Sequence, residues 1–179
     1  MSVTVEPDTF RFVHFDSEVV RRVGDDLVAL LGIERPVRIE IDETTPLARM
    51  RVDIGDTIDI HVESGAFEDT KRPRHQSELT TTINLGRCLL KARDRLNGGF
   101  GEAPPDSELA LRQVAAWDTY CVGRLARLGL SVNEQRWRYN FRNRHGFTDR
   151  ADAAFEKVWT AEGLTWGELD AISEGAVEV

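Results

Sequence analysis

The spacing of apolar and polar residues predicts strands in the first third of the chain. Three short segments alternate apolar and charged residues one by one, which is typical of strands with one buried and one solvated face. These segments are residues 36–41, 50–54 and 57–62. Gly55 and Asp56 predict a tight turn between the last two. A shorter alternation at residues 9–15 predicts an additional first strand.

Helical spacing predominates elsewhere. Apolar residues between Val20 and Leu31 fall on one stripe, and Gly32 is placed to end this helix. A polar loop is expected at residues 64–76, followed by a central helix over residues 79–96 that is apolar on two adjoining faces. Further helices are predicted from Asp106 to Gly129, from a capping box at Ser131 and Glu134 to Gly146, from Thr148 or Asp149 onward, and from a capping box at Thr165 and Glu168.

Strands followed by helices predict an α+β fold. We expect a small antiparallel or mixed sheet of three or four strands at the N-terminus, covered by helices, and a helical C-terminal half. Residues 97–105 contain several glycines and two prolines and mark the best candidate boundary. The predicted organisation is therefore a sheet with its central helix at residues 1–97 and a helical region at residues 104–179, packed together as one compact domain.

Composition narrows the classes of protein. The chain has 179 residues, of which 41% are hydrophobic, enough for a substantial core. Its formal net charge of -8 argues against extensive binding to nucleic acid or to an anionic membrane, although a local basic patch stays compatible with it. No apolar run reaches the length of a membrane helix, so a cytoplasmic location is expected. Cys88 and Cys121 lie among apolar residues and are expected to be buried, reduced thiols.

One segment carries an incomplete metal-binding motif. The sequence at residues 77–81 is SELTT, at the start of the predicted central helix. The order of elements over residues 17–96 resembles the small zincin-like metallopeptidases, in which the helix after the substrate-binding edge strand carries the zinc motif HExxH. The resemblance matches Glu78 to the glutamate of that motif, whereas Ser77 and Thr81 stand where zinc-binding histidines are needed. It implies a catalytically degenerate site without metal or cofactor.

A second interpretation of this segment stays open. Ser77 is a suitable N-cap, and Glu78 is an acid of the kind that the first turn of a helix favours. On this interpretation the helix start alone explains both residues, without descent from a metallopeptidase.

Other candidate site residues are dispersed. His61 and Glu63 share one face of a predicted strand at ligand-like spacing, and His75 lies shortly before Glu78. These four residues are candidates for a pocket, although a structural or exposed role is the alternative for each histidine. His145 lies at a helix end, where a protonated imidazole would complement the helix dipole. Cross-strand ion pairs with arginines 38, 49 and 51 are expected to account for the aspartates at 53 and 59.

Residues 136–150 combine arginines with aromatic residues. The candidates for anion binding are Arg136, Arg138, Arg142 and Arg144. Arginine beside aromatic rings suits phosphate contact and base stacking. The alternative is a core-facing aromatic stripe whose arginines pair with the excess acid of this chain.

The sequence thus predicts a non-catalytic scaffold or interaction protein that binds a protein partner and neither a membrane nor a metal. The alternative is a module that binds an anionic ligand or nucleic acid through residues 136–150. A weaker third hypothesis is a hydrolase whose site is assembled from His61, Glu63 and Glu78.

Overall fold

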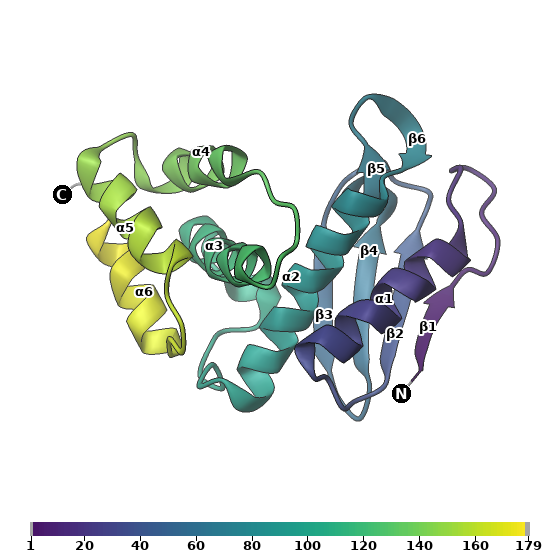
Figure 1. The fold of residues 1–179 in the computed structure, drawn as a ribbon, viewed down its shortest axis with the longest axis horizontal. Coiled ribbons are helices and arrows are strands. Elements are labelled where there is room, and N and C mark those ends of the chain that lie inside the picture. Colours follow the sequence, from purple (N-terminus) through teal and green to yellow (C-terminus); the bar gives the residue numbers. More distant parts are fainter. Residues whose placement is uncertain (1, 178–179) are drawn as a thin grey trace. The chain divides into compact units, whose positions relative to one another are not determined.

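The computed structural model describes residues 2–177 and confirms the α+β class (Figure 1). A mixed four-stranded sheet lies near the N-terminus, and the C-terminal half is helical. The chain forms two compact units, Met1–Ala92 and Arg93–Val179, which we call unit 1 and unit 2. All four tryptophans and both tyrosines of the sequence belong to unit 2.

The sheet of unit 1 has the strand order β1-β2-β4-β3. Its strands are β1 (Val3–Glu6), β2 (Val37–Asp42), β3 (Met50–Ile54) and β4 (Ile58–Glu63). β1, β2 and β4 are parallel, whereas β3 pairs with β4 in antiparallel fashion and forms an edge. The tight turn predicted at Gly55 and Asp56 is thereby confirmed.

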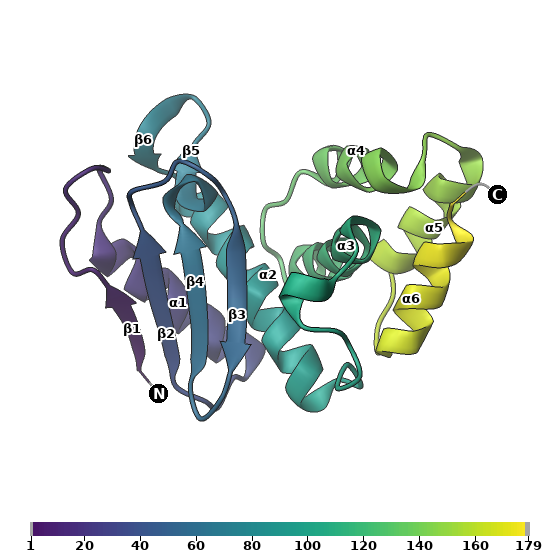
Figure 2. The same ribbon diagram turned by 180° about the vertical axis from the view of Figure 1, so that it is seen from behind.

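Two helices cover one face of this sheet. They are α1 (Ser17–Leu31) and the part of α2 (Glu78–Asn97) that belongs to unit 1 (Figure 1). Ile39 and Ile60 are almost fully buried, whereas the residues between the buried positions of β2 and β4 are partly exposed. Figure 2 shows the opposite face, over which no helix of unit 1 lies. The strands therefore have one apolar and one polar face, as their alternation predicts.

The strand predicted at residues 9–15 is wrong. The first strand is β1, and residues 9–15 lie in the loop that joins β1 to α1. In this loop Phe10 and Phe15 pack edge to face with ring centroids 5.6 Å apart, while Phe12 is 60% exposed. The alternation of residues 10, 12 and 14 therefore does not mark a strand with one buried face.

The loop predicted at residues 64–76 is also wrong. This segment forms the 3₁₀ helix η1 (Ser64–Phe67) and a hairpin of β5 (Glu68–Asp69) and β6 (Arg72–Gln76). Phe67 is completely buried and anchors the segment. The backbone N–H of Lys71 donates to the Asp69 carboxylate at 2.9 Å, which closes the turn of the hairpin.

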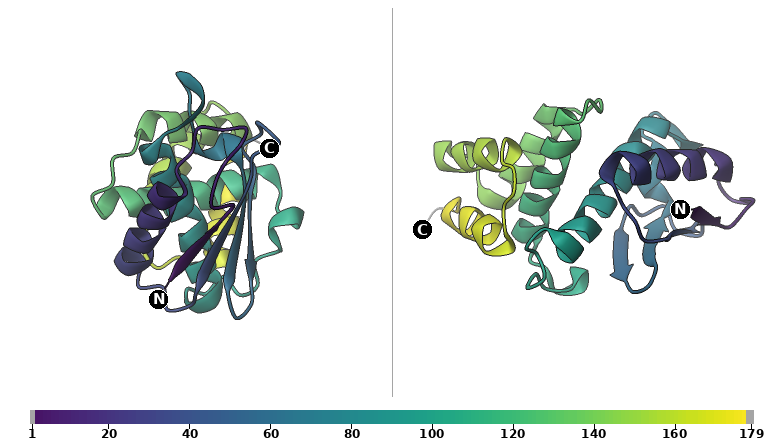
Figure 3. Two further views of the ribbon diagram at one scale, coloured as in Figure 1. Left: turned by 90° about the vertical axis from the view of Figure 1, so that its right-hand side faces the viewer. Right: turned by 60° about the horizontal axis from the view of Figure 1, so that its bottom comes forward.

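Unit 2 is a set of helices that pack on α3 (Figure 3). They are α3 (Leu111–Arg127), α4 (Glu134–His145), α5 (Asp149–Trp159) and α6 (Trp166–Gly175), preceded by the 3₁₀ helix η2 (Asp106–Glu108). The helix predicted from Asp106 therefore begins later, because Asp106 opens a separate turn and forms an ion pair with Arg95 at 3.0 Å.

The caps of these helices agree with the sequence in most places. The capping box predicted at Ser131 is wrong, because the side chain of Asn133 accepts the N–H of Arg136 at 3.2 Å and caps α4. The cap at Thr148 and the capping box at Thr165 are confirmed.

A buried ion pair lies inside unit 2. Both guanidinium Nη atoms of Arg124 contact the two carboxylate oxygens of Asp94 at 2.7 Å. The indole N–H of Trp117 donates to Asp94 at 2.9 Å, and the guanidinium of Arg124 lies 3.7 Å from the ring centroid of Tyr120. Asp94 is 3% exposed and Arg124 is 7% exposed. Burial lowers the pKa of Arg124, but the hydrogen bonds with Asp94 outweigh it and raise the pKa.

Candidate functional site

The hydroxyl groups at the start of α2 are engaged with the helix backbone. The Ser77 hydroxyl oxygen accepts the backbone N–H of Thr80 at 3.1 Å, which confirms Ser77 as a cap. The Thr81 hydroxyl donates to the carbonyl oxygen of Ser77 at 2.8 Å, and Thr81 is fully buried. Both side chains therefore have structural partners within their own helix.

Glu78 is engaged in a surface ion pair. Its carboxylate lies 2.9 Å from the guanidinium of Arg22 on α1, and more than half of each side chain is exposed. The pair links the two helices that cover the sheet. Glu78 thus makes a contact that stabilises packing between helices, with a water-exposed carboxylate.

His61 lies on the open polar face of the sheet. Its Nδ1 is 2.9 Å from the Glu40 carboxylate, and its Nε2 is 3.1 Å from the Asp53 carboxylate. Glu63, on the same face, forms an ion pair with Arg49 at 3.1 Å. Glu40 lies on β2 and Asp53 on β3, so the side chain of His61 ties β4 to both of its neighbouring strands.

The four pocket candidates do not come together. His61 and Glu63 face away from α1 and α2, whereas Glu78 lies on α2. His75 stacks on His14 with ring centroids 4.7 Å apart. Within residues 2–177 no group of three or more metal-ligating side chains has a geometry that could hold a metal ion.

The cross-strand ion pair predicted for Asp59 is confirmed, because Asp59 on β4 lies 3.4 Å from Arg38 on β2. The arginine that pairs with Asp53, at 3.2 Å, is Arg51 on the same strand, so the cross-strand arginine pair predicted for Asp53 is wrong. Cys88 and Cys121 are buried, as predicted, and neither is part of a disulfide.

No family model, curated protein or solved structure matches this chain. In the part of the chain that the structure describes, none of the helices combines the length and the apolar character needed to cross a bilayer.

Two of the four arginines proposed for anion binding form ion pairs with carboxylates of unit 2. Arg142 contacts the Asp152 carboxylate at 2.7 and 2.9 Å, and these hydrogen bonds raise the pKa of Arg142 and lower that of Asp152. Arg138 pairs with Glu134 at 3.0 Å and also with Glu156. The alternative interpretation of these two arginines, pairing with the chain's own acid, is the arrangement that the structure has.

The rest of α4 is more exposed. Arg136 and Arg144 are exposed and make no side-chain ion pair or hydrogen bond among the described residues. Tyr139 and Phe147 are 59% and 63% exposed and pack edge to face at 5.8 Å. Phe141, by contrast, is fully buried and belongs to the core.

The sequence did not reveal a serine-histidine pair in unit 2. His145 Nε2 lies 2.8 Å from the Ser173 hydroxyl, and its Nδ1 lies 3.0 Å from the carbonyl oxygen of Phe141. A carbonyl only accepts, so Nδ1 carries the proton and Ser173 donates to Nε2. Ser173 is completely buried and His145 is 3% exposed, so this serine is closed to substrates. The pair is structural.

A protonated His145 would complement the helix dipole, but its surroundings disfavour that form. Burial lowers the pKa of His145 below its ordinary value of 6.5; the hydrogen bond with the Phe141 carbonyl opposes this in part, and Arg112 and Glu174 make smaller contributions of opposite sign. The folded protein therefore contains a neutral imidazole that donates to and accepts from its neighbours.

This imidazole makes stability depend on pH. Below pH 6.5 the unfolded chain binds a proton that folded His145 resists, so the free energy of unfolding should fall as the pH is lowered from about 7 to about 5. Urea unfolding at a series of pH values measures this slope. We expect a smaller slope in His145→Gln and an unchanged one in the control Gly167→Ala, which alters no titratable group. Equal slopes in wild type and His145→Gln would contradict the assignment.

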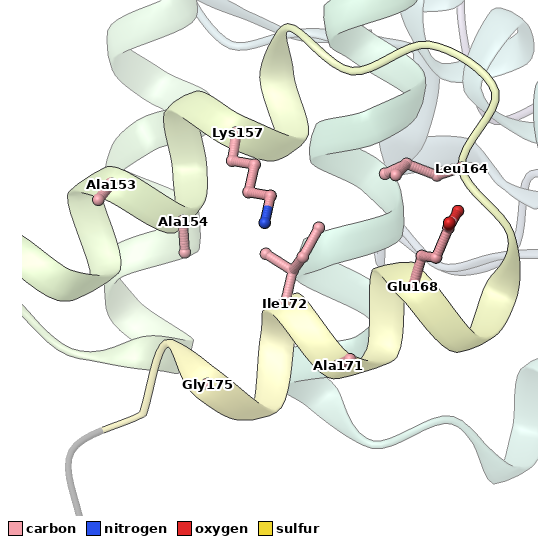
Figure 4. A pocket seen from close by; sticks show the side chains of 8 residues that line it. All are labelled: Ala153, Ala154, Lys157, Leu164, Glu168, Ala171, Ile172 and Gly175. Atoms are coloured by element: carbon pink, nitrogen blue, oxygen red, sulfur yellow. The ribbon is translucent and has the colours of Figure 1, made fainter.

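A shallow groove of about 590 Å³ lies between α5 and α6 (Figure 4). The side chains that line it are mostly small or apolar, with Lys157 pointing in from α5 and Ile172 from α6. Glu168, at its rim, is held by the capping box, where its carboxylate accepts the N–H of Thr165 at 2.9 Å. The groove therefore lacks a set of convergent polar groups for catalysis.

Proposed function

We propose that this chain is a non-catalytic interaction protein built on a catalytically degenerate zincin-like fold. The observation that carries the proposal is the state of the three side chains at the start of α2. The hydroxyl groups of Ser77 and Thr81 form hydrogen bonds with the helix backbone, and the Glu78 carboxylate forms an ion pair with Arg22. Hydroxyl groups are poor zinc ligands, so this arrangement suits a helix that contributes stability and no metal chemistry.

The topology of unit 1 supports the kinship. β3 is an antiparallel edge strand, and α2 comes after it in the chain, separated from it by β4, η1 and the β5–β6 hairpin. In the resemblance, too, a substrate-binding edge strand comes before the zinc-binding helix. A fold that keeps the plan of the sheet without the ligands can still present surfaces to another protein.

Metal analysis tests the proposal directly. The purified protein is incubated with zinc, desalted and analysed for bound metal, and hydrolysis of fluorescent casein is followed in parallel. We expect zinc well below one ion per chain and no turnover, in both the wild type and Glu78→Gln. One tightly bound zinc ion per chain, or turnover that Glu78→Gln abolishes, would sink the proposal.

A further inference from the structure

Two segments that are distant in sequence meet at one end of unit 1. The loop between β1 and α1 lies beside the β5–β6 hairpin (Figures 1 and 2). The backbone N–H of His14 donates to the carbonyl oxygen of Arg74 at 2.8 Å, and the N–H of Asp16 donates to the Gln76 side chain at 3.1 Å. The stacked rings of His14 and His75 join the same segments. Both segments follow parallel strands, whose carboxyl ends are the usual ligand-binding end of such sheets.

The cationic side chains of unit 1 that lack a partner gather on these two segments. Arg11 lies in the loop, and Lys71, Arg72 and Arg74 lie in the hairpin. All four are exposed, and their side chains make no ion pair or hydrogen bond with the described residues. Every other lysine or arginine in residues 2–92 has such a contact. The two segments carry as many carboxylates as cations (Asp8, Asp16, Glu68 and Asp69), so what sets these four cations apart is that they have no ionic partner in the described part of unit 1.

An exposed aromatic ring accompanies these charges. Phe12 is 60% exposed, and its neighbour is Arg11. The Glu43 carboxylate accepts the backbone N–H groups of both residues, at 2.6 Å for Arg11. The backbone that presents the ring is thus fixed to the loop after β2, so a partner would lose little entropy in ordering it. We call Arg11, Phe12, Lys71, Arg72 and Arg74 the basic patch.

We propose that the basic patch is a docking surface for a short acidic segment of a partner protein that carries an apolar side chain. The proposal rests on the proposed function and names its partner class. Guanidinium forks suit carboxylates, and an aromatic ring among arginines is the usual composition of an energetic hot spot.

A protein segment fits this surface better than a nucleic acid strand does. The patch is bordered along the chain by the carboxylates of Asp8, Asp16 and Asp69, and Glu43 lies beneath the loop. A strand with a phosphate on every nucleotide would meet these carboxylates and the overall charge of -8. A peptide can carry its charges only where the arginines and the lysine lie.

Fluorescence anisotropy of the full-length protein tests the proposal. The probe is a short fluorescein-labelled peptide of alternating glutamate and phenylalanine. Comparison probes replace glutamate by lysine or phenylalanine by serine, and labelled oligothymidine and phosphatidylserine vesicles represent the other anionic partners. We expect the glutamate–phenylalanine peptide to bind most tightly and its affinity to fall as salt is raised.

Variants locate the binding surface. Arg11→Glu combined with Arg72→Glu should weaken binding about tenfold or more, since two exposed charge pairs become repulsive. Arg136→Glu combined with Arg144→Glu makes the same charge change in unit 2 and should leave the affinity within about twofold. Phe12→Ser should remove the preference for the phenylalanine peptide over the serine peptide. Arg74 has a backbone φ of 65°, so Arg74→Gly deletes a charge while relieving the backbone and should weaken binding without loss of stability.

The possible results divide cleanly. Absence of binding at low salt, equal weakening by the two charge-reversal variants, or tighter binding to oligothymidine or vesicles would each overturn the docking proposal. Zinc is measured on the same preparation. If the protein binds one zinc ion per chain and the basic patch still binds the peptide, only the proposed function is contradicted. If the protein contains no zinc and does not bind the peptide, only the docking proposal is contradicted.

Discussion

Asp94→Ala is expected to lower the free energy of unfolding by about 3–5 kcal/mol, the usual cost of leaving one buried charge without its partner. Arg124 would remain 7% exposed with both Nη atoms deprived of their carboxylate contacts. The indole N–H of Trp117 would lose its acceptor as well. Urea unfolding followed by tryptophan fluorescence measures the change, because every tryptophan lies in unit 2.

Two controls separate the buried pair from ion pairing in general. Glu174→Ala breaks the exposed pair with Arg112 and should cost less than about 1 kcal/mol. Asp94→Leu combined with Arg124→Met removes both charges and should recover much of the stability that Asp94→Ala loses. If Asp94→Ala proved no more harmful than Glu174→Ala, the buried pair would not hold unit 2 together.

Gly123→Ala is the second substitution with a large expected effect. Gly123 lies in α3 where this helix meets α5, and a Cβ there would stand 3.0 Å from the carbonyl carbon of Trp159 and closer still to its oxygen. The backbone of α5 would have to move away. Overpacking of this kind costs about 1–3 kcal/mol, and contact with backbone places Gly123→Ala at the upper end of that range.

The matched control is Gly167→Ala in α6. No atom lies within 4 Å of a Cβ at Gly167, so alanine there should be neutral or stabilise the protein by up to about 1 kcal/mol through its helix propensity. Thermal unfolding of the two variants in parallel gives the comparison. Equal melting temperatures would show that α3 and α5 pack less closely than the structure has them.

Local patterns predicted most of the helices and strands because the residues that decide them are neighbours in sequence. The alternation in β2, β3 and β4 and the caps at Thr148 and Thr165 are such cases. The errors arise where a distant contact decides. The polar composition of residues 64–76 predicts a loop, whereas the buried Phe67 holds this segment in the fold. The alternation in residues 9–15 predicts a strand, but no neighbouring strand pairs with this segment beyond a single bridge at His14.

Site residues were harder to predict for the same reason. His145 gave no sign of its bond to Ser173, because Ser173 lies on another helix. For Arg138 and Arg142 the sequence left ligand binding and pairing with the chain's own acid both open, because the acids Glu156 and Asp152 lie on another helix. The basic patch depends on a contact between residues 14 and 74–75, which the spacing of charges along the chain does not encode.

The distribution of aromatic residues has a practical consequence. Because unit 1 contains neither tryptophan nor tyrosine, almost all near-ultraviolet absorbance of the chain comes from unit 2. A proteolytic fragment that holds only residues 1–92 would pass an absorbance detector on a chromatography column almost unseen. Fragments of this protein should therefore be quantified by peptide-bond absorbance or by staining.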